Sequence, residues 1–73
     1  MAVQVVMDQS GDSRHIFDSN DSAAVALGEQ RFMKLTGAGF TAAVRSGIGE
    51  PRIIKRFDPK AEETLFYPRL VGG

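Results

Sequence analysis

The sequence predicts a small α+β domain with one helix, and three observations support this class. Apolar side chains recur at every second position in residues 2–8 and 40–45, as they do in half-buried strands. Residues 23–36 instead carry an apolar stripe at spacings of three and four, which is typical of an amphipathic helix. The 73 residues, 42% apolar and 25% charged, have the length and composition of one globular domain.

The first two strands are expected to form a β-hairpin. Val3, Val5 and Met7 share one face of the first strand, which spans residues 2–8. Turn-forming residues follow, and Gly11 among them can take a positive φ without steric cost before residues 13–17 become extended again.

The helix is expected next. Residues 18–22 supply side-chain oxygens that can cap its free N–H groups, and Gly37 is expected to cap its C-terminal end. Its apolar face is formed by Val25, Gly28, Phe32 and Leu35. A glycine on this face costs about 1 kcal/mol relative to alanine, so Gly28 suggests that the helix packs closely on its neighbours.

The rest of the chain alternates between strands and loops. The expected elements are a third strand at 40–45, a loop at 46–51, a fourth strand at 52–57, one helical winding after Asp58-Pro59, and a fifth strand at 64–67. A hairpin, a helix crossing one face, and a last strand returning parallel to the first together form the β-grasp arrangement. The main alternative, a ferredoxin-like fold, needs a second full helix, for which residues 59–63 are too few.

The predicted core combines one face of each element. It consists of Val3, Val5, Ile16, Val25, Phe32, Leu35, Val44, Ile54, Phe57 and Phe66. The chain is expected to be a single domain over residues 1–73. Residues 69–73 are expected to form a flexible tail, because Pro68 limits strand pairing and two glycines end the sequence.

Several classes of function are disfavoured by composition. The chain has no cysteine and one histidine, His15, which cannot build a zinc site alone and is interpreted as a surface strand residue. Asp8, Asp12 and Asp18 do not have the spacing of a calcium loop. We therefore expect no metal site, no bound cofactor and no catalytic residues.

The charged residues give no strong nucleic-acid signal. Nine lysine and arginine residues balance nine aspartate and glutamate residues, which removes the basic field expected of a nucleic-acid-binding protein. The best basic cluster is Arg45, Arg52, Lys55, Arg56 and Lys60. Strand alternation would divide it between two faces. The adjacent Glu62 and Glu63 are interpreted as surface residues, not as an acid/base pair.

No membrane segment or signal peptide is expected. The longest apolar run, residues 23–27, is far below the roughly 20 residues of a membrane helix. The first ten residues lack the basic start of a signal peptide. We expect a soluble, cytoplasmic protein.

The pair Gly72-Gly73 at the end of the sequence suggests a different kind of chemistry. A terminal glycine has no Cβ, so its carboxylate can enter a narrow enzyme channel and adopt backbone angles closed to other residues. An activating enzyme could then use ATP to convert that carboxylate into an acyl-adenylate, which sulfur or an amine later displaces. In that case the small protein supplies the carboxylate and a docking surface, and its partner supplies the catalysis.

Residues 63–73, ETLFYPRLVGG, carry an acidic residue, a short apolar strand, an aromatic pair, a proline and the diglycine. This segment resembles the ending of ubiquitin-like β-grasp proteins, and is most similar to the sulfur-carrier family of the MoaD and ThiS type. The resemblance implies a carrier or protein modifier that is activated at Gly72 and Gly73. It also implies an activating enzyme as partner, which uses the ATP.

The resemblance further implies which side chains meet that enzyme. Tyr67 or Phe66, whichever faces outward, would contact it together with Leu70, while Arg69 would pair with its acidic groups; Phe66 is favoured as a core residue. Two alternatives stay open: a β-grasp interaction module without tail chemistry, and an accessory domain of phage or plasmid origin with an unassigned partner.

Overall fold

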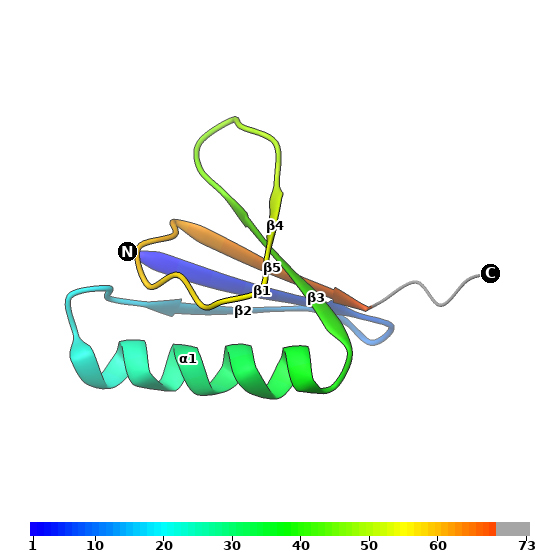
Figure 1. Ribbon diagram of the computed structural model, residues 1–73, viewed down its shortest axis with the longest axis horizontal. Coiled ribbons are helices and arrows are strands. Elements are labelled where there is room, and N and C mark those ends of the chain that lie inside the picture. The colour runs from blue at the N-terminus through cyan, green and yellow to red at the C-terminus, as the bar shows by residue number, and fades with distance from the viewer. Residues whose placement is uncertain (69–73) are drawn as a thin grey trace.

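The computed structural model describes residues 1–68 and contains one helix and a five-stranded mixed sheet (Figure 1). The elements are β1 (Ala2–Asp8), β2 (Gly11–Phe17), α1 (Ser22–Gly37), β3 (Phe40–Arg45), β4 (Arg52–Ile54) and β5 (Glu63–Pro68). The strand order across the sheet is β2-β1-β5-β3-β4. The predicted α+β class is therefore confirmed.

The last strand lies in the centre of the sheet. β5 runs parallel to β1, from Val3 opposite Glu63 to Val6 opposite Phe66, and antiparallel to β3 on its other side. The predicted parallel pairing of the first and last strands is confirmed. This order is compatible with the β-grasp arrangement, and residues 1–68 contain no second helix of the kind that a ferredoxin-like fold needs.

The β1–β2 hairpin forms as expected. Asp8 pairs with Gly11, and Gly11 takes a φ of 121°, which glycine adopts without strain. The Asp8 carboxylate accepts hydrogen bonds from the backbone N–H and the hydroxyl of Ser10, at 2.8 and 2.6 Å. These bonds lower the pKa of Asp8 and hold the turn that sets the hairpin register.

The helix begins as predicted but ends differently. Asp21 is the N-cap, and its carboxylate accepts from the backbone N–H groups of Ala23 and Ala24. Gly37 was expected to cap the C-terminal end, but it is the last helical residue, and Ala38 is the cap. The positive φ of 102° occurs at Gly39, so the reversal into β3 falls two residues later than the sequence suggested.

The connection from β4 to β5 departs most from expectation. β4 stops at Ile54, three residues before the predicted end at Phe57, because Phe57 leaves the sheet to pack against Phe32 with ring centroids 5.8 Å apart. The expected helical winding is a tight turn, in which the N–H of Lys60 and that of Ala61 bond to the side chain and carbonyl of Asp58.

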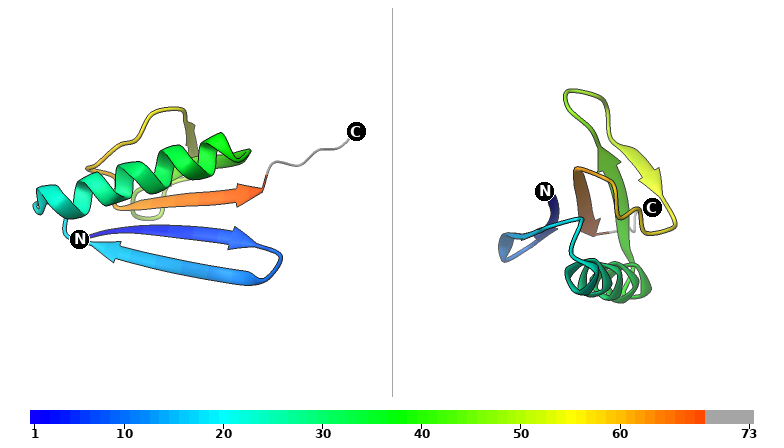
Figure 2. Two further views of the ribbon diagram at one scale, coloured as in Figure 1. Left: turned by 90° about the horizontal axis from the view of Figure 1, so that it is seen from below. Right: turned by 90° about the vertical axis from the view of Figure 1, so that its left-hand side faces the viewer.

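The main core lies between α1 and one face of the sheet (Figure 2). It is formed by Val6, Phe32, Ala42 and Phe66, with Leu35, Phe40, Ile54 and Phe57 packed against them. The Phe32 ring meets the Phe66 ring in an edge-on arrangement at 5.8 Å, as it does that of Phe57. Phe32 is therefore the centre of an aromatic cluster that joins the helix, the sheet and the β4–β5 connection.

Three predicted core residues lie on the other face of the sheet. Val3 and Val5 alternate along β1 with Gln4 and Val6, which face the helix, and Ile16 of β2 pairs with Val3 on the outer face. Val5 is nevertheless buried and Val3 half-buried, whereas Ile16 is 66% exposed and is not a core residue. The error has a physical reason. A glutamine in an alternating strand suggests solvent, but Gln4 is buried because its amide is hydrogen-bonded to the helix.

The other predicted core positions are at least partly buried. Phe32, Val44 and Phe66 are buried, Leu35, Ile54 and Phe57 pack on the core cluster, and Val25 is half-buried. No helix in the described part of the chain is long and apolar enough to cross a membrane.

Candidate functional site

The predicted site begins at the C-terminal end of the central strand. Phe40 and Thr41 of β3 pair there with Pro68 and Tyr67, so Pro68 is still part of the sheet. Four of the predicted site residues, Arg69, Leu70, Gly72 and Gly73, and the expected flexible tail at 69–73 lie outside the described residues.

The two aromatic residues of β5 face opposite sides of the sheet. Phe66 is fully buried beneath the helix in the core cluster, as expected. Tyr67, the next residue along the strand, lies on the face away from α1 because side chains alternate along a strand, and it is half-buried there. Of the two side chains that were considered for partner contact, Tyr67 is the one on the outer face.

Tyr67 belongs to a largely apolar surface, which we call the open sheet face. Its uncharged members are Val3, Val5, Ile16, Thr41, Ala43, Ile53, Leu65 and Tyr67, which share one face by strand alternation and register. Val5 and Ala43 are themselves buried, and the exposed Arg14 stands opposite Val5 on the same face. Ile16 and Ile53 are 66% and 63% exposed. In residues 1–68 the single helix lies on the opposite face (Figure 2), and the β4–β5 connection also passes on that side, where Phe57 meets Phe32.

Sequence reasoning missed this surface because it assigned three of these residues to the core. The signal that could have found it is the presence of apolar residues at both parities of β1, where Val5 and Val6 are both buried. A strand that is apolar on both sides is a central strand with two apolar faces, and only one of these can meet a single helix. The open sheet face is the consequence.

One ion pair lies at the end of the open sheet face far from Tyr67. Arg45 and Glu63 are cross-strand partners, and the guanidinium of Arg45 bonds to the Glu63 carboxylate at 2.6 and 2.8 Å. Both groups are accessible to solvent, so this pair contributes little to stability. Glu62 is exposed, whereas Glu63 is partly buried and engaged with Arg45.

The remaining charged candidates do not converge. Asp8 and Asp12 lie at the turn of the hairpin, whereas Asp18 follows its other end. No group of three or more histidine, aspartate or glutamate residues suited to a metal occurs within residues 1–68. The basic cluster is spread over β3, β4 and the connection to β5, with Arg45 already paired to Glu63.

His15 is less exposed than its interpretation as a surface strand residue suggested. It is half-buried on β2, faces α1, and lines a groove between these two elements. Partial burial, and then the nearby positive charge of Arg31, lower the pKa of His15 below its ordinary value of 6.5.

Comparison with protein-family models, with curated proteins and with solved structures finds no match to this chain.

Proposed function

We propose that the chain is a ubiquitin-like β-grasp protein that acts as a non-catalytic carrier or protein modifier, activated at Gly73 by a partner enzyme. The observation that carries the proposal is the course of β5. This strand is central, runs parallel to β1, buries Phe66 under the helix, and precedes the diglycine in the sequence. A rigid sheet would thereby anchor the segment whose carboxylate reacts.

The chemistry would take place at the carboxylate of Gly73, in the active site of the partner. A carboxylate oxygen attacks the α-phosphorus of ATP, the bond to the leaving pyrophosphate breaks, and an acyl-adenylate forms. A sulfur or amine nucleophile then attacks the carbonyl carbon and AMP leaves, which yields a thiocarboxylate or an amide. The carrier contributes no acid or base, and Gly72 keeps the reacting end narrow. A cytoplasmic location belongs to this proposal, because the reaction consumes ATP.

The open sheet face would supply the docking surface. Tyr67 lies on it near the end of β5, and in the sequence only Pro68 stands between Tyr67 and residues 69–73. Exposed isoleucines at positions 16 and 53 extend this surface toward both edge strands. Arg69 and Leu70 would add a charged and an apolar contact close to the reacting end.

A second candidate function is a β-grasp interaction module without tail chemistry, and the open sheet face favours it. A contiguous apolar surface marks an interaction site whether or not the chain end beyond β5 reacts. In that case Ile16, Ile53 and Tyr67 would carry the binding, and the diglycine would be irrelevant.

The experiment begins with the intact mass of the chain isolated from its source cells, because activation requires Gly73 to be the free carboxyl end. The purified chain is then incubated with ATP and an adenylating enzyme of the sulfur-carrier class from the same source. The carrier function predicts an adenylate or thiocarboxylate at Gly73, detected as a mass increase. Deletion of Gly73 should abolish this product without changing the melting temperature.

Two surface variants separate docking from chemistry. Tyr67→Ala should slow activation by raising the KM for the carrier, whereas Met33→Ala, on an exposed part of the helix, should leave it unchanged. A chain that continues beyond Gly73 in cells, or that gives no product with the enzyme, would refute the carrier function. Unaltered partner binding after removal of both glycines would identify the interaction module instead.

A further inference from the structure

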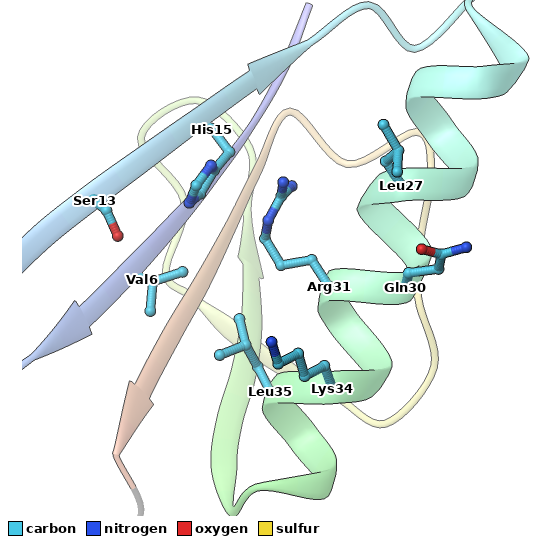
Figure 3. A pocket seen from close by; sticks show the side chains of 8 residues that line it. All are labelled: Val6, Ser13, His15, Leu27, Gln30, Arg31, Lys34 and Leu35. Carbon is cyan, nitrogen blue, oxygen red and sulfur yellow. The ribbon is translucent and has the colours of Figure 1, made fainter.

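The groove between β2 and α1 combines cationic and apolar side chains (Figure 3). It has a volume of about 410 Å³. Its polar lining includes Ser13 and His15 of β2 and Arg31 and Lys34 of α1, and its apolar lining is Val6, Leu27 and Leu35. Figure 3 shows His15 and Arg31 pointing into the space between the strand and the helix from opposite sides.

The side chain of Arg31 is held in place by the buried amide of Gln4. Its Nη1 donates to Oε1 of Gln4 at 2.8 Å, and Nε2 of the same glutamine donates to the backbone oxygen of Gly28 at 3.0 Å. Gln4 is fully buried, so both ends of its amide are used and its orientation is determined. One corner of the guanidinium is thereby fixed, and its remaining N–H groups are left to bond elsewhere.

The positive charge of the groove is not neutralised by residues 1–68. Within this range no acidic side chain lines the groove, and the one ion pair is that of Arg45 with Glu63. Lys34 lies one helical turn after Arg31 and faces the same groove. A neutral His15 and the Ser13 hydroxyl add hydrogen-bonding groups from the strand.

Apolar side chains flank this cationic centre on both sides. Leu27 and Leu35 lie four residues before and after Arg31, and Leu27 is 60% exposed. Eight helical residues span about 12 Å. A volume of about 410 Å³ and this length match a small molecule better than an extended segment of a partner protein.

We propose that the β2–α1 groove binds a small amphipathic carboxylate, an organic acid with an apolar body. The carboxylate would accept paired N–H bonds from the guanidinium of Arg31, with Lys34 as a second charge. The apolar body would cover Leu27 or Leu35. Free inorganic phosphate has no apolar part to bury, and it is the weaker ligand for this groove. The groove lies on the helix side of the sheet, opposite to the open sheet face.

The test is an NMR titration of the full 15N-labelled chain with 4-methylpentanoate. The neutral 4-methylpentanamide and inorganic phosphate serve as comparison probes. We expect saturable shifts at the amides of His15, Leu27, Arg31 and Leu35 with the acid, and affinity at least about tenfold weaker for the amide. Equal binding of acid and amide, or no saturable shift with the acid, would overturn the proposal.

Matched variants locate the site. Arg31→Gln should weaken binding of 4-methylpentanoate about tenfold or more, and Lys34→Gln should weaken it by a smaller factor. Arg14→Gln is the control, because Arg14 is exposed and lies on the face of β2 that points away from the groove. If Arg31→Gln unfolds the chain, Lys34→Gln and Leu27→Ala, on the exposed helix surface, carry the test. Equal losses for Arg14→Gln and Lys34→Gln would indicate non-specific attraction and refute the site.

A competing occupant has its own signature. β2 is an edge strand, so an extended peptide could pair along it. An acidic peptide that shifts every β2 amide, with no competition from 4-methylpentanoate, would assign the groove to a protein partner and overturn the small-molecule assignment.

Discussion

The side-chain amide of Gln4 joins β1 to the middle of the helix, because its Nε2 donates to the backbone oxygen of Gly28 at 3.0 Å. The same amide accepts from Arg31, so a single buried polar group fixes both the depth of the helix and the direction of a cation at the groove. A buried amide with both ends bonded determines orientation in a way that an aliphatic side chain cannot.

Replacement of Gln4 should therefore be costly. Gln4→Ala should lower the free energy of unfolding by about 2–4 kcal/mol, because a cavity is added to the lost hydrogen bonds. Gln4→Met preserves the volume and should cost less, about 1–2 kcal/mol. Urea unfolding measures both, with Gln9→Ala in the exposed hairpin turn as the control. A Gln4→Ala value as small as that of the control would contradict the buried amide.

Two helical glycines should respond in different ways to alanine. A Cβ at Gly28 would lie 3.3 Å from Cζ of Phe17 and 3.4 Å from Cζ of Phe57, whereas a Cβ at Gly37 would meet nothing within 4 Å. Gly37→Ala should raise stability by about 0.5 kcal/mol through helix propensity. Gly28→Ala should give a free energy of unfolding at least about 1 kcal/mol lower than that of Gly37→Ala, because the phenyl rings must move to admit the Cβ. Equal gains in thermal unfolding would mean that the helix does not pack closely at Gly28.

Phe32 should dominate the stability of the core. Phe32→Ala removes the ring that contacts both Phe57 and Phe66, and it should cost about 3–5 kcal/mol, a large share of the stability of a small domain. The neighbouring Met33→Ala, at an exposed position, should cost less than about 0.5 kcal/mol. Chemical denaturation measures the free energy of unfolding of both variants. A larger loss for Met33→Ala than for Phe32→Ala would mean that the helix turns a different face to the core.

Two substitutions, one on each face of the β1–β2 hairpin, test which of its faces packs against the helix. Val6→Ala, in the core under the helix, should cost about 2 kcal/mol, whereas Ile16→Ala, on the open sheet face, should cost less than about 1 kcal/mol. The sequence pattern taken alone predicts the opposite order. Equilibrium unfolding of the two variants therefore decides between two registers that differ by one residue.

His15 should make the protein more stable above neutral pH than below it. Its pKa is lowered first by partial burial and then by Arg31, with Lys34 on the same helix face and neutral Gln4 opposite on β1. The unfolded chain then binds the proton more readily than the folded one. The contribution is therefore fully present above about 6.5 and is lost as the pH falls through the lower, folded pKa.

An NMR titration of the His15 ring measures this pKa directly. Arg31→Gln should raise it part of the way toward 6.5, because the effect of burial remains. Binding of a carboxylate in the groove should raise it further. A folded pKa above 6.5 in the free protein would contradict the described environment.

The sequence predicted the elements better than their faces. Local signals, such as the capping side chains at 18–22, the glycine at position 11 and the alternation in β1, are set by neighbouring residues and appear in the structure where expected. The choice of face depends on Gln4, whose burial is possible only because a helix backbone 24 residues away meets it. No local pattern contains that information.

The candidate sites were less accessible to sequence reasoning. Of the alternating residues Phe66 and Tyr67, one must face away from the core, and the structure places Tyr67 on that outer face; its role in partner contact stays a prediction. The β2–α1 groove was missed because it needs residues from β1, β2 and α1 in one place. His15 alone carries no such signal.

The central position of β5 also determines when the fold can be completed. A ribosome must synthesise at least as far as residue 66 before the middle of the sheet exists, because β1 and β3 do not pair directly and are joined only through this strand. Until then the nascent chain holds two separate hairpins with their inner edges unpaired. Closure of the longest loop is thus the last step in forming this sheet, and it makes folding slow for a domain of this size.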